Sequence, residues 1–256
     1  VFHHNLPAQM TSFIGREKER EEIKQALSAH RLVTLTGSGG AGKSRLSLQV
    51  GMDCLDQFAD GVWLVELAPI TDPALIPQAL LSTFRLREDR HRSVLDVLID
   101  YLRGRTLLLI LDNCEHLIEA CAEISETLLQ ACPKLRILAS SREALGLTGE
   151  VADRVPSLTA PNRENLPPLD QLQKADSIRL FVERAATAKP GFTLTDINAF
   201  SLAQICYRLD GIPLAIELAA ARVNMFSTAQ IASRLDDRFH LLTGGSRTAL
   251  PRQQTM

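Results

Sequence analysis

Short apolar runs alternate along the first 155 residues with segments whose apolar positions recur at helical spacing. The runs predict strands at 31–36, 62–67, 106–111, 135–140 and, more weakly patterned, 151–155. The periodic segments predict helices at 16–29, 45–52, 73–84, 93–102 and 117–131. Run 106–111 is almost wholly apolar, which is typical of a central strand covered on both faces. This alternation predicts a parallel sheet with helices on both faces.

The pattern changes after residue 156, where four prolines fall within thirteen residues. Beyond them no strand pattern occurs, and helical periodicity predicts helices at 172–187, 196–209, 213–223 and 228–239. We expect a small all-α bundle of about four helices to follow the α/β domain. The predicted organisation is an α/β domain at 1–156 with an extended segment at 1–15, a linker at 157–168, a helical domain at 169–242 and a polar tail at 243–256.

Composition narrows the possible environments and partners. The formal net charge of the 256 residues is −2 and aromatic residues make up 5%, so neither a basic field nor a base-stacking surface is expected. The five cysteines fit no zinc spacing and are interpreted as reduced core thiols of a cytoplasmic protein. The longest apolar stretch, 107–111, is too short to span a bilayer. We therefore expect no direct nucleic-acid or membrane binding.

A glycine-rich loop carries the clearest chemical signal. Residues 37–44 read GSGGAGKS and fit the phosphate-binding pattern GxxxxGK[ST], between a predicted strand and a predicted helix. Glycines let successive N–H groups turn toward an anion, Lys43 can reach the terminal phosphates, and the Ser44 hydroxyl can ligate Mg²⁺. The alternative is a flexible surface turn. The residues expected to contact the nucleotide here are Gly37, Ser38, Gly39, Gly40, Ala41, Gly42, Lys43, Ser44 and Arg45.

Asp112 follows the apolar run 107–111 and fits the Walker B position, where a carboxylate holds Mg²⁺ directly or through water. The alternative is a helix-capping aspartate. The next residue is Asn113, which cannot accept a proton, so hydrolysis is expected to be slow. Glu115 and His116 are alternative bases, although each also fits the start of a helix.

The strand predicted at 135–140 ends in Ser140, Ser141 and Arg142. A polar tip on a strand beside the phosphate loop can contact the γ-phosphate, and Arg142 would compensate its charge. The alternative, an arginine in a solvated loop, is weighed equally.

Five segments occur in the order seen in STAND NTPases, the signal-transduction ATPases with numerous domains. The segments are 13–17, 37–44, 107–113, 139–142 and 211–215. Together they extend over about residues 5–254, and the chain most resembles the NB-ARC-like ATPase module of large bacterial transcriptional regulators.

The resemblance implies roles that composition does not. Gly15 and Arg16 would lie in the segment that closes over adenine, Ser140 and Arg142 would contact phosphate, and Pro213 would pack near the base or ribose. Pro213 also fits a simple helix start. The strand at 135–140 would lie between the phosphate-loop strand and the Walker B strand. Family members continue into a winged-helix domain, and this chain stops at 250–254, where that domain would begin.

We therefore expect an ATP- or ADP-binding switch module with Mg²⁺ and slow ATP hydrolysis, cut from a longer regulator. Its partners would be the winged-helix, sensor and effector domains of the same polypeptide and, in the ATP state, further copies of itself. The helical domain would report the nucleotide state by moving. The alternatives are a fully active AAA-like ATPase and a structural interaction module with a degenerate site. A GTPase is disfavoured because no NKxD tetrapeptide occurs.

Overall fold

The computed structural model describes residues 3–162 and 167–235. Within them the chain forms two compact units. Unit 1 consists of residues 3–13, 17–39 and 43–155, and unit 2 consists of residues 14–16, 40–42 and the described residues from 156 onward. The predicted end of the last helix at 236–239, the tail at 243–256 and linker residues 163–166 lie outside the described residues.

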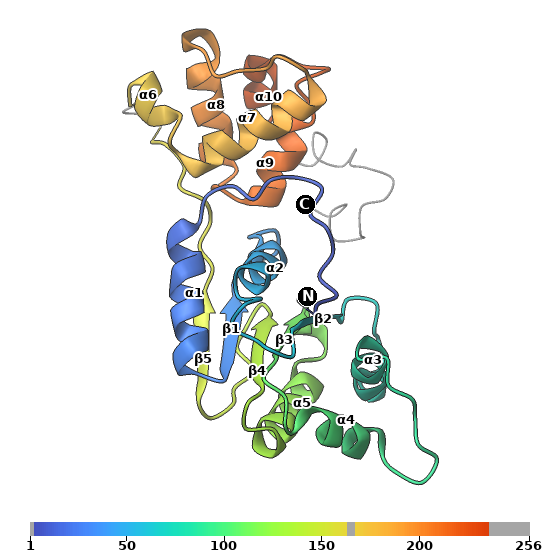
Figure 1. Ribbon diagram of the computed structural model, residues 1–256. Helices are drawn as coiled ribbons and strands as arrows, with labels where there is room; N and C mark the ends of the chain where they lie inside the picture. The colour runs from blue at the N-terminus through green and yellow to red at the C-terminus, as the bar shows by residue number, and fades with distance from the viewer. Residues whose placement is uncertain (1–2, 163–166, 236–256) are drawn as a thin grey trace. The chain divides into compact units, whose positions relative to one another are not determined.

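Unit 1 is built on a five-stranded parallel sheet (Figure 1). Its strands are β1 (Leu32–Thr36), β2 (Val62–Glu66), β3 (Leu108–Asp112), β4 (Arg136–Ser140) and β5 (Glu150–Arg154), in the spatial order β2-β3-β4-β1-β5. All four neighbouring pairs are parallel. The predicted sheet is confirmed, as is the insertion of β4 between β1 and β3.

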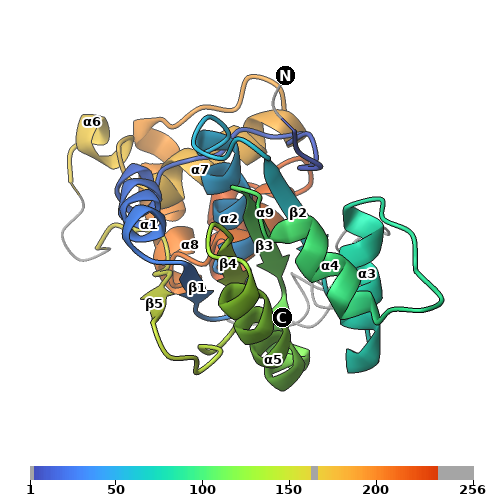
Figure 2. The same cartoon turned by 60° about the horizontal axis from the view of Figure 1, so that its bottom comes forward.

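Helices cover both faces of this sheet, as predicted (Figure 2). They are α1 (Glu17–Ala29), α2 (Lys43–Asp53), α3 (Ile76–Thr83), α4 (Val94–Leu102) and α5 (Ile118–Ala131), with short 3₁₀ turns η1 (Pro73–Leu75) and η2 (Cys114–His116). Apolar residues of α1 and α2 share one core cluster with strand residues, and those of α3, α4 and α5 share the other.

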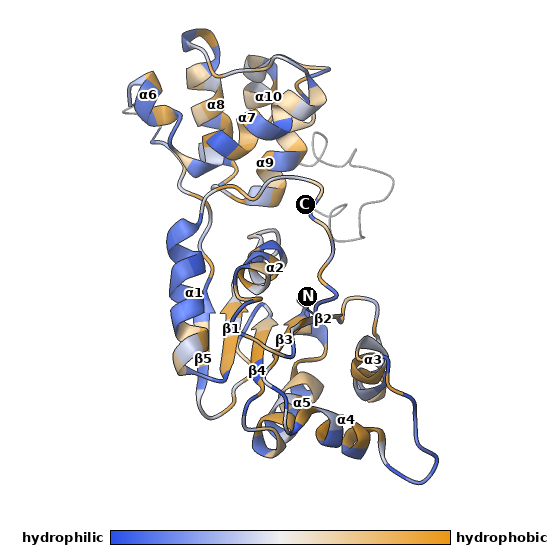
Figure 3. Ribbon diagram, viewed as in Figure 1, coloured by the Kyte–Doolittle hydropathy of each residue, from blue (hydrophilic) through white to orange (hydrophobic). Residues whose placement is uncertain are grey.

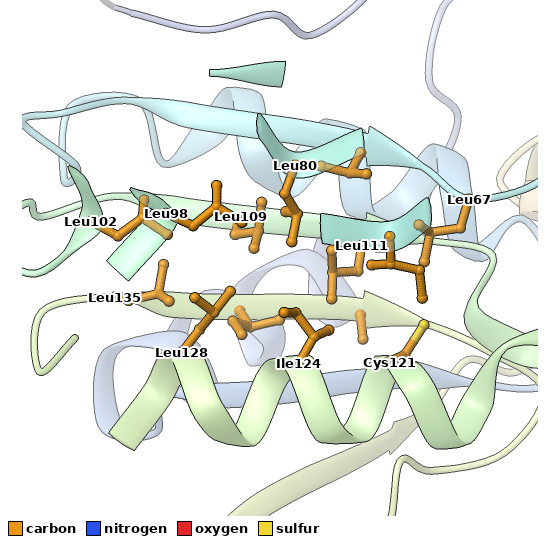
Figure 4. Close-up of a cluster of buried hydrophobic side chains, with 14 of the residues drawn as sticks. Leu67, Leu80, Leu98, Leu102, Leu109, Leu111, Cys121, Ile124, Leu128 and Leu135 are labelled. Carbon is orange, nitrogen blue, oxygen red and sulfur yellow. The ribbon is translucent and has the colours of Figure 1, made fainter. Parts of the chain in front are cut away.

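Strand β3 shows why its sequence is a continuous apolar run. Leu108 and Ile110 belong to the cluster under α1 and α2, whereas Leu109 and Leu111 belong to the cluster under α3, α4 and α5. Figure 4 shows Leu109 and Leu111 facing the leucines of these helices. Successive strand residues point to opposite faces, so burial on both faces requires apolar residues throughout. Figure 3 shows that β3 is hydrophobic, whereas α1 is largely hydrophilic.

Unit 2 is a helical bundle, as predicted, with five helices in the described residues. They are α6 (Leu169–Leu172), α7 (Asp176–Ala188), α8 (Asp196–Arg208), α9 (Pro213–Ala220) and α10 (Thr228–Arg234). Their core includes Phe181, Ile205 and Ile216, each fully buried. Leu158 from the predicted linker joins this core, and its N–H donates to the Gly211 carbonyl at 2.9 Å.

Two predicted helices are each divided in the structure. The segment 73–84 forms the turn η1, capped by Asp72, and then α3, which has Pro77 in its first turn. A proline has no N–H to donate, so it favours the start of a helix over its middle. The segment predicted to be one helix at 172–187 forms the end of α6 and then α7, because Ala175 has an extended backbone.

The five cysteines are buried thiols without disulfides, which confirms their interpretation as core residues. Burial raises the pKa of the Cys206 thiol to about 12, so this thiol stays neutral. In the described part of the chain, no helix combines the length and the apolar character needed to cross a bilayer.

Candidate functional site

The glycine-rich loop connects β1 to α2, as predicted, at residues 37–42. Gly37, Gly40 and Gly42 have φ values of 145°, 77° and 88°, which side chains rarely adopt. A Cβ on Gly37 would also lie 3.0 Å from the Val155 carbonyl oxygen. Only glycine fits these positions without strain, and the bare backbone that results lets an anion approach the loop N–H groups closely.

Lys43 is the first residue of α2, two residues earlier than the predicted helix start. Its side chain folds back over the loop, and Nζ donates to the carbonyl oxygens of Gly37 at 2.8 Å and Ser38 at 3.0 Å. Lys43 is 9% exposed. A phosphate bound at this loop would bring a negative charge to the buried ammonium, and hydrogen bonds between opposite charges are among the strong ones in proteins.

The two residues after Lys43 differ in their surroundings. Ser44, in the first turn of α2, is exposed. Arg45 Nη2 donates to the carbonyl oxygens of Thr11 at 3.1 Å and Ser12 at 2.9 Å, and to the Thr11 hydroxyl at 3.0 Å. The structure therefore places Arg45 against the N-terminal segment of unit 1.

Asp112 and Ser140 end the neighbouring strands β3 and β4. The Ser140 hydroxyl donates to the Asp112 carboxylate and accepts from the N–H of Asn113 at 2.9 Å. Parallel strands bring their carboxyl ends to one edge of the sheet, where ligands commonly bind. Ser140 thus fixes the orientation of Asp112, a contact that the sequence did not predict.

Asn113 adopts the left-handed conformation at φ 70° and ψ 53°. Its Nδ2 lies 3.2 Å from His116 Nδ1, while His116 Nε2 lies 2.7 Å from the Ile70 carbonyl oxygen. These partners assign the proton of a neutral imidazole to Nε2 and leave Nδ1 as the acceptor from the amide. Both ring nitrogens of His116 are therefore engaged, which disfavours it as the alternative base.

Glu115 and Arg142 lie together. Arg142 Nε is 3.7 Å from Glu115 Oε1, and the arginine side chain is 64% exposed against 14% for the glutamate. A guanidinium nitrogen of Arg142 also lies 4.0 Å from the position a Cβ would take on Gly39. Arg142 is thus beside the glycine loop, as predicted, and is also within reach of Glu115.

A cavity of about 530 Å³ opens at the start of the loop. It is lined by Thr36, Gly37, Ser38, Gly39, Arg142 and Arg154. Sequence reasoning missed Arg154. The available signal was its place near the end of the strand predicted at 151–155, but its position beside the loop depends on the pairing of β5 with β1.

The remaining predicted residues meet within unit 2. Arg16 is 4% exposed, and its Nη2 donates to the carbonyl oxygens of Ala41 at 2.7 Å and Pro156 at 2.8 Å. The N–H of Leu214, in the first turn of α9, donates to the Gly40 carbonyl oxygen at 3.3 Å. This bond satisfies one of the N–H groups that a helix start leaves without an internal partner.

Two glycines of unit 2 are closely approached by side chains of the same unit. A Cβ on Gly42 would lie 3.7 Å from Pro213 Cγ, and a Cβ on Gly15, which has φ 69°, would lie 2.3 Å from the Asp176 carboxylate. The structure therefore brings the predicted residues 15 and 16, the loop centre 40–42 and Pro213 into one neighbourhood of unit 2.

Comparison with known proteins supports the resemblance. A family model described as Novel STAND NTPase 1 matches residues 4–214. An uncharacterized protein of Mycobacterium tuberculosis is 41% identical over 253 residues, covering 99% of this chain and 61% of that protein. A second M. tuberculosis protein, named as a candidate HTH-type transcriptional regulator, is 44% identical over 234 residues, covering 91% of this chain and 25% of that protein.

A solved structure has the same fold. The STAND protein with a tetratricopeptide repeat sensor from Pyrococcus horikoshii superposes with a TM-score of 0.53 at 15% identity, covering 84% of this chain and 31% of that one. The chain thus spans only part of the length of each of these proteins.

Proposed function

The chain belongs to the Novel STAND NTPase 1 family, and we propose that it is an adenine-nucleotide switch module of a larger regulator. The observation that carries the proposal is the loop 37–42, where three left-handed glycines precede a lysine folded over two loop carbonyls. Such a loop at a helix start offers N–H groups and a positive charge to phosphate.

Phosphate binding is assigned to the loop and Lys43. The loop N–H groups donate to the phosphate oxygens, and the Lys43 ammonium moves from the Gly37 and Ser38 carbonyls onto the terminal phosphates. Bonds between the ammonium and an anion replace bonds between the ammonium and neutral carbonyls, so the exchange favours the bound state.

Mg²⁺ is assigned to Ser44 and Asp112, which supply the oxygen ligands that this ion prefers. When bound, the ion neutralises charge on the β- and γ-phosphates. Ser140 holds the Asp112 carboxylate in one orientation through its hydroxyl, and the Asn113 N–H holds Ser140. Arg142 is assigned to the γ-phosphate, for which it would leave Glu115.

Gly15, Arg16 and Pro213 are assigned to the adenine or ribose. Their common neighbourhood with loop residues 40–42 supports this assignment. We propose that the helical unit reports the nucleotide state through the hydrogen bond from the Leu214 N–H to the Gly40 carbonyl. Phosphate binding would shift the loop and with it the Gly40 carbonyl, which would strengthen or weaken this bond.

The wider role is proposed from the relative named as a candidate HTH-type transcriptional regulator. In this proposal the module lies in the cytoplasm, where buried thiols stay reduced, and acts with the winged-helix, sensor and effector domains of one polypeptide. It self-associates in the ATP state and leaves nucleic-acid contacts to other domains. The formal net charge of the sequence, −2 at pH 7, supports the last point.

We expect the protein to bind adenine nucleotides in preference to guanine nucleotides. The physical basis is the assignment of Gly15, Arg16 and Pro213 to the base, together with the lack of an NKxD motif. Competition against fluorescently labelled ADP with Mg²⁺ measures the preference, with CTP as the control for non-specific phosphate binding. GTP that displaces the label as well as ATP does would disprove the base assignment, and no binding of labelled ADP would disprove the proposed function.

We expect ATP turnover by the isolated module to stay below about 1 s⁻¹, against about 10 s⁻¹ for a median enzyme. Asn113 cannot accept a proton, and His116 has both ring nitrogens engaged. Steady-state phosphate release measures the rate. Faster turnover without a partner would favour the AAA-like ATPase over the switch. The variant Glu115→Gln is expected to keep the residual rate, and its complete loss would identify Glu115 as the base.

A further inference from the structure

The pairing of the strands places positive charge on both flanks of the glycine loop. Strand β1, which leads into the loop, pairs with β4 on one side and β5 on the other. Leu35 pairs with Ser140, so Arg142 follows on the first flank, and Thr36 pairs directly with Arg154 on the second. The sequence separates these two arginines by a turn and a strand, and the fold brings both to the cavity beside Gly37.

The cavity has the chemistry of an anion site. Among its six lining residues, Arg142 and Arg154 are the charged ones, and both are cations. The hydroxyl of Thr36 donates to the Asp153 carbonyl at 3.3 Å, which leaves its lone pairs and the backbone of Gly37–Gly39 as the neutral lining. Its volume of about 530 Å³ accommodates a phosphoryl group together with ordered water.

Asp153, the acidic residue nearest in sequence to Arg154, lies on the opposite face of the sheet from Arg154. Successive strand residues alternate between the faces of a sheet, so Asp153 points away from the face to which Arg154 belongs. Val151, which shares the face of Asp153, packs against the core cluster that includes Ile23 and Leu27 of α1. Burial, followed by the charges of Glu22 and Glu19 on α1, raises the pKa of the Asp153 carboxyl. The charge of Arg154 is therefore not cancelled by its neighbour on the strand.

The two arginines differ in their present partners. Arg142 is 3.7 Å from the Glu115 carboxylate. In the described part of the chain, the Arg154 side chain takes part in no hydrogen bond or ion pair, and it is exposed at the cavity. A guanidinium in that position can bind phosphate oxygens through two parallel N–H groups without first breaking another contact.

We propose that Arg154 binds the terminal phosphoryl group of a nucleoside triphosphate held by the same chain. Arg154 thereby makes the site prefer triphosphate over diphosphate. The proposal rests on the proposed function, because it requires the β-phosphate of the nucleotide to lie in the glycine loop. Arg142 and Arg154 then approach the terminal phosphate from the two flanks of β1.

The experiment compares Arg154→Gln with the wild type by calorimetric titration with Mg²⁺, using ADP and the slowly hydrolysed analogue ATPγS. We expect the analogue affinity to fall by about tenfold or more, since the bonds lost are charge-assisted, and ADP affinity to change by less than about twofold. Arg87→Gln, at an exposed position in the loop between α3 and α4, removes the same charge elsewhere and should change neither affinity. Arg154→Lys keeps the positive charge but lacks the two parallel N–H groups of the guanidinium. Its affinity for ATPγS should lie between those of the wild type and Arg154→Gln.

The possible outcomes separate the two proposals. Equal effects of Arg154→Gln on both nucleotides, or no effect on either, would overturn the role of Arg154 while leaving the switch module intact. A wild type that binds neither nucleotide would instead overturn the proposed function. Inorganic phosphate is titrated into the ADP complex as well: if it binds equally well to the wild type and to Arg154→Gln, the terminal-phosphate assignment is wrong.

A dilution series distinguishes contact within one chain from contact between copies. The loss of ATPγS affinity in Arg154→Gln should be the same at all protein concentrations if the arginine serves its own chain. A loss that appears only where light scattering detects association would assign Arg154 to the nucleotide of a neighbouring copy, which contradicts the proposal. If Arg154→Gln does not fold by circular dichroism, Arg154→Lys is used for the same comparison, and an unchanged ratio of ATPγS to ADP affinity overturns the proposal.

Discussion

Replacing Lys43 with alanine is expected to lower the affinity for both ATP and ADP by about tenfold to a hundredfold, which corresponds to about 1.5–3 kcal/mol. The lysine is buried over the loop, where Nζ donates to two carbonyls, and a phosphate bound there would place an opposite charge beside the ammonium. The loss should affect both nucleotides, because the ammonium reaches the β-phosphate that they share. Isothermal titration with Mg²⁺ measures it.

The control for this variant is Lys134→Ala, which removes the same charge from an exposed position in the turn before β4. Its affinities should equal those of the wild type. The thermal unfolding temperature of Lys43→Ala without nucleotide is measured as well, since the variant also removes two hydrogen bonds from the loop. A folded Lys43→Ala protein with unchanged affinity would remove the basis for a phosphate site at this loop.

Replacing Asp112 with asparagine is expected to abolish most of the gain in nucleotide affinity that Mg²⁺ provides. Asparagine keeps an oxygen that can accept from the Ser140 hydroxyl but lacks the negative charge that attracts the ion. Affinity without Mg²⁺ should change little, because the carboxylate would act on the nucleotide through the metal. Titrations of ATP with Mg²⁺ and with EDTA measure the two affinities and their ratio.

Asp56→Asn, at an exposed position after α2, is the matched control and should keep the full response to Mg²⁺. Ser140→Ala tests the orientation of the carboxylate: it should weaken the response to Mg²⁺ only partly, because the charge of Asp112 remains. If Asp112→Asn responds to Mg²⁺ as strongly as the wild type does, another group holds the ion and the Walker B assignment is wrong.

The sequence alone was sufficient to predict the two-part architecture. Strand β3 is covered on both faces, and such burial leaves a continuous apolar run that can be recognised without a structure. The glycine loop was predictable for a similar reason, since φ values such as the 88° of Gly42 restrict the residue type at each position. Both signals are local, because the residue type at each position is restricted by the backbone conformation and the burial of that same position.

The contacts of the candidate site depended on the tertiary structure. Ser140 meets Asp112 only because β4 pairs with β3, and Arg154 reaches the loop only because β5 pairs with β1. Arg45, for which a nucleotide contact was predicted, donates to the carbonyl oxygens of residues 11 and 12, a pairing that the sequence did not predict. Strand order and side-chain contacts of this kind join residues far apart in sequence. They therefore produce no periodic pattern along the chain. The sequence thus determined which elements form and where phosphate chemistry is concentrated, and the packing of the sheet decided which side chains surround it.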